Sequence, residues 1–124
     1  MNKILIVDDD PFMCELLAAI LEEEGYTVSS AEDGTSAFSA FCADAHLGLL
    51  ISDMNMPDFS GLELLQKIRA RGSKIPAIIL SGDEDLAHNP ALIKANCEIL
   101  VKDENVQENI GAFVAAVLHK HQLR

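Results

Sequence analysis

Short apolar runs alternate along the chain with longer stretches in which apolar residues recur at helical spacing. Continuous runs of aliphatic and β-branched residues predict buried strands, because both faces of a parallel sheet are covered. Apolar residues three and four positions apart predict helices. The predicted strands are residues 3–7, 26–30, 49–51, 77–80 and 98–101, and the predicted helices are residues 11–24, 34–43, 60–71 and about 104–121.

Two prolines carry signals for helix starts. Asp10 before Pro11 is the expected N-cap, followed by proline at the first helical position. The segment 83–96 is the least regular, because Pro90 in a helix interior would cost about 3 kcal/mol. A helix that begins at Pro90, with Asn89 as its cap, avoids that cost. Such a helix is short, and we expect little packing to hold it.

The alternation of strands and helices predicts an α/β fold, with a five-stranded parallel sheet and helices on both faces. The 124 residues fit a single domain. In doubly wound sheets of this kind, ligands bind at the carboxyl ends of the strands, beside the point where the strand order reverses. The residues directly after each strand are therefore the candidates for function.

Composition and charge exclude several classes of function. Hydrophobic residues make up 49% of the chain, enough for a packed core, and no apolar run approaches the roughly 20 residues of a membrane span. The N-terminus lacks the features of a signal peptide, so we expect a cytoplasmic protein. A net charge of −11 repels phosphate backbones, which argues against direct nucleic-acid binding. The three cysteines form no CxxC pair, and we expect buried free thiols rather than zinc ligands.

Polar side chains gather at the predicted strand ends. Three carboxylates, a hydroxyl and an amine follow strands one, three, four and five: Asp8, Asp9, Asp53, Ser81 and Lys102. Each alone is an ordinary turn, cap or surface residue, but their joint placement favours a site. Clustered carboxylates repel unless a cation lies among them, and Mg²⁺ prefers such oxygen ligands. The pattern predicts a Mg²⁺ site with Asp53 as the nucleophile toward a phosphoryl group.

Three segments carry a resemblance to a known family. The runs ILIVDDD at 4–10 and LISDMNMP at 50–57, with SGLELL at 60–65, resemble the receiver domain of bacterial response regulators. The resemblance covers essentially the whole chain, residues 1–124. It implies a flavodoxin-like (βα)5 fold, similar to the single-domain chemotaxis regulators. It also implies a conformational switch in a two-component phosphorelay, with a sensor histidine kinase or phosphotransfer protein as phosphoryl donor and a separate downstream protein effector.

The resemblance also implies roles for the acidic residues. Asp53 matches the phosphoacceptor, and Asp9 matches the direct metal ligand. Asp8 matches the acidic partner that acts through water, and Asn55 matches the position whose backbone carbonyl binds Mg²⁺. Such a domain supports only its own phosphotransfer and dephosphorylation, so we do not expect an enzyme that turns over a substrate.

The switch residues match the family with two departures. Ser81 matches the hydroxyl that turns toward the phosphate, and Lys102 matches the lysine that pairs with it. Asp103 stands where the family usually has a proline after a cis bond, so we expect a trans Lys102–Asp103 bond. Ile99 replaces the aromatic switch residue, and we expect it to stay buried in both states.

Two other functions remain as alternatives. An aspartate-nucleophile phosphohydrolase also uses Mg²⁺, and the run Asp8-Asp9-Asp10 contains the Asp-x-Asp spacing of that family, although 124 residues leave no room for its cap domain. A pseudo-receiver that binds partners without being phosphorylated is favoured by Ile99 and Asp103, and opposed by the intact acidic cluster. Multiple turnover on a phosphomonoester would favour the hydrolase, whereas one phosphate retained on Asp53 would favour the receiver.

Overall fold

The computed structural model describes residues 3–83, 85 and 88–122. Within this part, the strands are β1 (Lys3–Val7), β2 (Thr27–Ala31), β3 (Leu47–Asp53), β4 (Ala77–Ser81) and β5 (Glu98–Val101). The helices are α1 (Pro11–Glu23), α2 (Gly34–Ala43), α3 (Gly61–Ala70), α4 (Pro90–Ala95) and α5 (Val106–Gln122). Every strand and helix expected from the sequence is present; β3 is longer than predicted and β2 begins one residue later.

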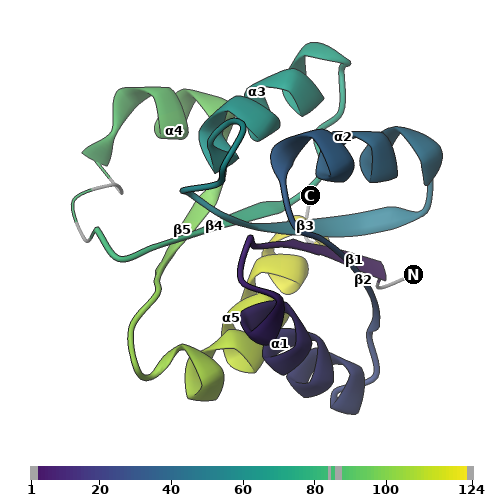
Figure 1. The fold of residues 1–124 in the computed structure, drawn as a ribbon, viewed down its shortest axis with the longest axis vertical. Coiled ribbons are helices and arrows are strands. Elements are labelled where there is room, and N and C mark those ends of the chain that lie inside the picture. Colours follow the sequence, from purple (N-terminus) through teal and green to yellow (C-terminus); the bar gives the residue numbers. More distant parts are fainter. Residues whose placement is uncertain (1–2, 84, 86–87, 123–124) are drawn as a thin grey trace.

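The strands form one parallel sheet in the order β2-β1-β3-β4-β5. Helices α1 and α5 cover one face, and α2, α3 and α4 cover the other (Figure 1). The predicted doubly wound α/β fold is therefore confirmed. The chain runs outward from β1 to β2, then returns past β1 to β3, so the strand order reverses between β1 and β3. Ligands bind at the carboxyl ends of the strands beside such a reversal.

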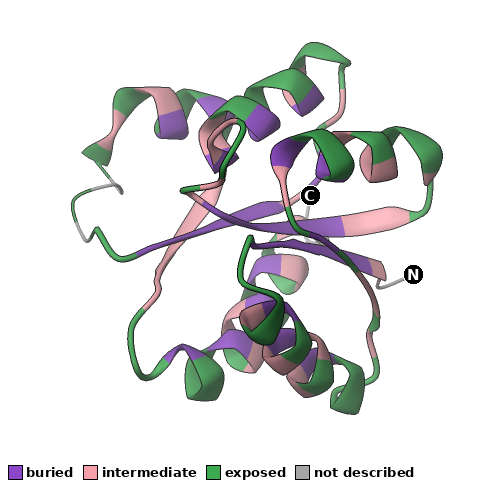
Figure 2. Ribbon diagram, in the orientation of Figure 1, coloured by how far each residue is buried: buried purple, intermediate pink, exposed green. Residues whose placement is uncertain are grey.

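Alternate residues of β1 belong to two separate cores. Ile4 and Ile6 pack on the side of α1 and α5, whereas Leu5 and Val7 pack on the side of α2 and α3. Successive side chains of a strand point to opposite faces, and here both faces are covered, so all four are at most 1% exposed. Figure 2 shows the central strands as largely buried, between helices whose outer sides are exposed. The central strands are thus fixed on both faces, which gives their carboxyl ends a rigid base.

Helix α4 begins at Pro90, with the Asn89 side chain accepting a hydrogen bond from the backbone of the first turn, as predicted. The expectation that little packing holds this helix was wrong. Leu92 and Ala95 are buried, and Arg69 of α3 donates a hydrogen bond from Nε to the Ala95 carbonyl at 2.8 Å. Sequence periodicity does not reveal a side chain that reaches the end of another helix.

Two expectations about burial were also wrong. Cys14 is buried, but Cys97 is only partly buried and Cys42 lies on the exposed side of α2. Ile99 is half-buried rather than buried, because β5 is an edge strand and the six-residue helix α4 covers it incompletely. Over the described residues, no helix combines the length and apolar character required to cross a membrane.

Candidate functional site

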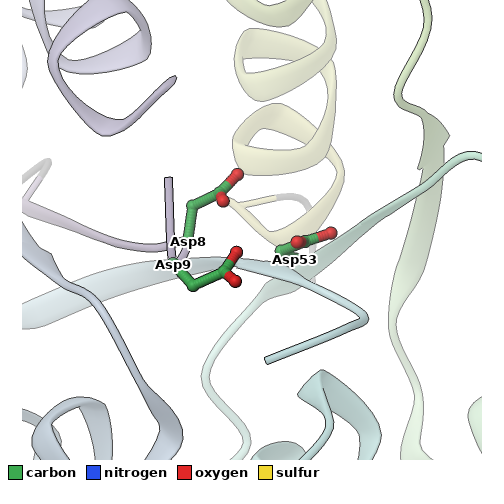
Figure 3. A group of neighbouring side chains, drawn as sticks. All are labelled: Asp8, Asp9 and Asp53. Atoms are coloured by element: carbon green, nitrogen blue, oxygen red, sulfur yellow. The ribbon is translucent and has the colours of Figure 1, made fainter. Parts of the chain in front are cut away.

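Three carboxylates meet at the carboxyl ends of β1 and β3. The two strands are neighbours, with Val7 paired to Ser52, so Asp8 directly after β1 lies beside Asp53 at the end of β3. Asp8, Asp9 and Asp53 each place a carboxylate oxygen within 4.8 Å of the other two (Figure 3). The structure therefore brings together the acidic residues that the sequence predicted.

Lys102 reaches this cluster from the end of β5, two strands away. Its backbone N–H donates to the Ser81 carbonyl at 2.7 Å, and the following bond to Asp103 is trans, as expected. The Lys102 Nζ lies 2.7 Å from Asp8 Oδ2 and 3.5 Å from Asp53 Oδ2. Partial burial alone would lower the pKa of Lys102, but the hydrogen bond that Lys102 donates to Asp8 and the negative charge of Asp53 outweigh this effect and raise the pKa. The ammonium group therefore stays charged between the two carboxylates.

The two adjacent aspartates differ in how far their oxygens are occupied. Asp8 is 1% exposed; its Oδ2 binds Lys102 and its Oδ1 accepts a hydrogen bond from the Asp10 backbone at 3.0 Å. Asp9 is exposed, and no donor in the described part of the chain binds its carboxylate. Asp9 is therefore the carboxylate whose oxygens are available to a ligand from solvent.

Asp53 is held in a poorly solvated position at the base of the site. It is 8% exposed. Burial raises the pKa of Asp53, the charge of Lys102 opposes this effect, and the charge of Asp8 adds to it. A bound cation would stabilise the ionised form of such a carboxylate. Opposite ligands of an octahedral Mg²⁺ lie about 4.2 Å apart, close to the span of this oxygen group, so the donor set fits a hard divalent ion.

Two further predicted site residues are Ser81, at the end of the neighbouring strand β4, and Asn55, in the loop after β3. Ser81 is the last residue of β4 and is buried, and its Oγ accepts a hydrogen bond from the Asp83 backbone at 3.0 Å. Asn55 is exposed, two residues beyond Asp53. Among the described residues, none donates a hydrogen bond to the Asn55 carbonyl. The Ser81 hydroxyl is thus bound to the loop that follows it, whereas the backbone oxygen of Asn55 is available to a ligand.

Gly61 and Asp58 help to shape the site. The sequence pointed to Gly61 only as part of the run SGLELL at 60–65, and it gave no role to Asp58. A Cβ atom at Gly61 would lie 2.5 Å from the Asp53 carbonyl oxygen, so only glycine lets α3 begin against the end of β3. Asp58 binds the start of α2 with its carboxylate. The run that contains Gly61 does not reveal how closely its backbone approaches β3, and an aspartate after a proline is a common loop residue, so neither contact could be predicted without the tertiary structure.

Comparison with known proteins gives a family match over most of the chain. The model of the response regulator receiver domain matches residues 4–113. The response regulator MprA of Mycobacterium ulcerans is 30% identical over 121 residues, which are 98% of this chain and 52% of that protein. The transcriptional regulatory protein AruR of Pseudomonas aeruginosa is 39% identical over 87 residues, which are 67% of this chain and 35% of that protein. The chain therefore spans about half the length of MprA, and its match to AruR covers about a third of that protein.

Solved structures of similar proteins share the fold. The response regulator TrrA of Thermotoga maritima, solved in complex with Mg²⁺ and BeF, aligns with a TM-score of 0.83 at 34% identity, over 94% of this chain and 99% of that one. The chemotaxis response regulator CheY4 of Vibrio cholerae aligns with a TM-score of 0.84 at 27% identity, over 94% of this chain and 98% of that one.

Proposed function

Since the chain belongs to the family of response regulator receiver domains, which act in two-component signalling, we propose that Asp53 receives a phosphoryl group from a histidine kinase or phosphotransfer protein. The observation that carries this proposal is the position of the Lys102 ammonium, which bridges Asp8 and Asp53 beside the open carboxylate of Asp9. The reaction requires Mg²⁺ and takes place in the cytoplasm. The resulting conformational change controls whether a downstream effector protein binds.

The metal would be held by the carboxylates of Asp9 and Asp53 and by the backbone carbonyl of Asn55. Asp8 would act through a water molecule, because Lys102 and a backbone N–H already occupy its oxygens. The bound ion would neutralise negative charge on the phosphoryl oxygens. Calorimetric titration with Mg²⁺ tests this division of roles. We expect Asp9→Ala to weaken binding more than Asp8→Ala, and equal losses would contradict it.

Phosphoryl transfer to Asp53 needs no further acid or base from this chain. A carboxylate oxygen forms the bond to phosphorus while the bond to the donor's histidine nitrogen breaks, and the released imidazole takes up a proton. Lys102 keeps its charge and can bind a phosphoryl oxygen in place of the carboxylate it now contacts at 3.5 Å. The Ser81 hydroxyl carries a proton that it can donate to another phosphoryl oxygen.

Incubation with acetyl phosphate and Mg²⁺ separates this proposal from its alternatives. A receiver domain forms acetate and retains one phosphate per chain, on a carboxylate. A phosphohydrolase releases many equivalents of inorganic phosphate, and a pseudo-receiver consumes no acetyl phosphate above the rate without protein. Measuring acetate, free phosphate and protein-bound phosphate in one reaction distinguishes the three. Sustained release without a retained phosphate would contradict the proposal.

A further inference from the structure

The loop between β3 and α3, residues 54–60, is fastened to the start of α2 through one carboxylate. Asp58 Oδ1 accepts hydrogen bonds from the backbone of Gly34 and of Phe59, both at 2.8 Å. Asp58 Oδ2 accepts from the backbone of Thr35 at 2.8 Å and from Thr35 Oγ1 at 2.6 Å. All of these donors except Phe59 lie more than 20 positions away in the chain, so the contact joins two separate loops of the sheet edge.

The start of α2 offers Asp58 two backbone donors that no other group in the described part of the chain binds. The first N–H groups of a helix have no partner within the helix. Asp33, the N-cap of α2, binds the N–H of Ser36 at 2.7 Å, which leaves those of Gly34 and Thr35 to Asp58. The four hydrogen bonds hold the pKa of Asp58 well below its usual range, so this side chain is charged at any physiological pH.

A ring contact beside Asp58 interlocks the same two segments. A Cβ atom at Gly34 would lie 2.4 to 2.7 Å from the Phe59 ring, so the ring occupies the space that any other side chain would need. The Lys67 ammonium lies over the Phe59 ring, 5.3 Å from the ring centre. Asp58 and Phe59 therefore fix the position of the end of the loop against the start of α2.

The geometry points to Asp58 as a positioning residue for the metal site, an inference that rests on the proposed function. The loop begins directly after Asp53 and contains Asn55, whose carbonyl would bind Mg²⁺. Near Asp53 the loop is held by hydrogen bonds from Met54 to the Leu80 carbonyl and from Gly61 to the Met54 carbonyl. The segment that contains Asn55 follows these bonds, and Asp58 holds the end of that segment against α2. Without this carboxylate, the loop would hold the Asn55 carbonyl in the binding position for a smaller fraction of the time.

A matched pair of variants separates positioning from helix stability. Asp58→Ala and Asp33→Ala each remove one carboxylate from the start of α2, but only the first frees the loop. We expect Asp58→Ala to raise the Mg²⁺ dissociation constant about fivefold, because only part of the population has the loop in place. Asp33→Ala should leave it within a factor of about two of wild type. Asp58→Asn keeps one oxygen acceptor and should fall between, which gives a milder variant if Asp58→Ala is poorly folded.

Hydrogen exchange of the metal-free proteins supplies a second measurement that does not involve Mg²⁺. The Phe59 amide should lose protection in Asp58→Ala and keep it in Asp33→Ala. Equal Mg²⁺ dissociation constants for the two alanine variants would overturn the role of Asp58 and leave the proposed function intact. A wild-type protein that binds no Mg²⁺ would overturn the proposed function, and this inference with it.

Discussion

Replacing Gly61 with alanine should destabilise the protein and slow phosphorylation of Asp53. The new Cβ would lie 2.5 Å from the Asp53 carbonyl oxygen and 3.1 Å from Ser52 Oγ. The nearest atom belongs to the backbone of a central strand, which cannot rotate away as a side chain can. Overpacking of this kind costs about 1–3 kcal/mol. The preference of alanine over glycine in a helix returns at most about 1 kcal/mol, so we expect a net loss of roughly 1–2 kcal/mol.

Gly111→Ala is the matched control, because it makes the same chemical change inside α5. The described atoms nearest to its Cβ would be those of the Glu24 carboxylate, at 3.5 to 3.6 Å, which is ordinary contact with a flexible side chain. We expect this variant to be up to about 1 kcal/mol more stable than wild type in urea denaturation. With acetyl phosphate and Mg²⁺, Gly61→Ala should be phosphorylated more slowly than wild type, and Gly111→Ala at the wild-type rate. A Gly61→Ala variant with wild-type stability and rate would refute the reasoning.

Three further predictions concern charge, helix anchoring and output. Because the pKa of Asp53 is raised in the folded protein, its charge opposes folding at neutral pH, and metal-free Asp53→Asn should be more stable than wild type at pH 7. In urea denaturation, this advantage should shrink as the pH falls through the raised pKa, and it should vanish below the ordinary value of 3.8. Arg69→Ala removes hydrogen bonds to three backbone carbonyls and should lower the free energy of unfolding by about 2 kcal/mol, with faster hydrogen exchange in α4. Arg69→Lys should restore little of this stability, because an ammonium group cannot reproduce the forked geometry of the guanidinium. With beryllofluoride, a stable mimic of the aspartyl phosphate, hydrogen exchange should change in residues 82–96, and a change centred instead on β5 around Ile99 would contradict this expectation.

Local patterns were enough to predict the elements and the acidic cluster. Asp10 before Pro11 and Asn89 before Pro90 cap α1 and α4 as expected, because an N-cap acts on residues within one turn of its own position. The convergence of Asp8 and Asp53 follows from parallel strands, whose carboxyl ends share one edge of the sheet. These predictions needed only the order of the elements and the residue types at their ends.

Contacts between distant elements could not be read in the same way. Arg69 binds the carbonyls at the end of α4, and Asp58 binds the start of α2, more than 20 positions away in each case. The exposure of Ile99 depends on how far a six-residue helix covers the edge strand. Such features depend on the packing of whole helices against the sheet, and a basic residue in a helix or an acidic one in a loop gives no sign of its distant partner.

The most direct test of the account is intact-mass spectrometry after incubation with acetyl phosphate and Mg²⁺. Wild-type protein should gain the mass of one phosphoryl group, and chelation of the metal should prevent the gain. Asp53→Asn should gain nothing, although Asp8, Asp9 and Lys102 remain in place. A phosphoryl group that still appears on Asp53→Asn, or a wild-type protein that gains none, would contradict the assignment of Asp53 as the phosphoacceptor.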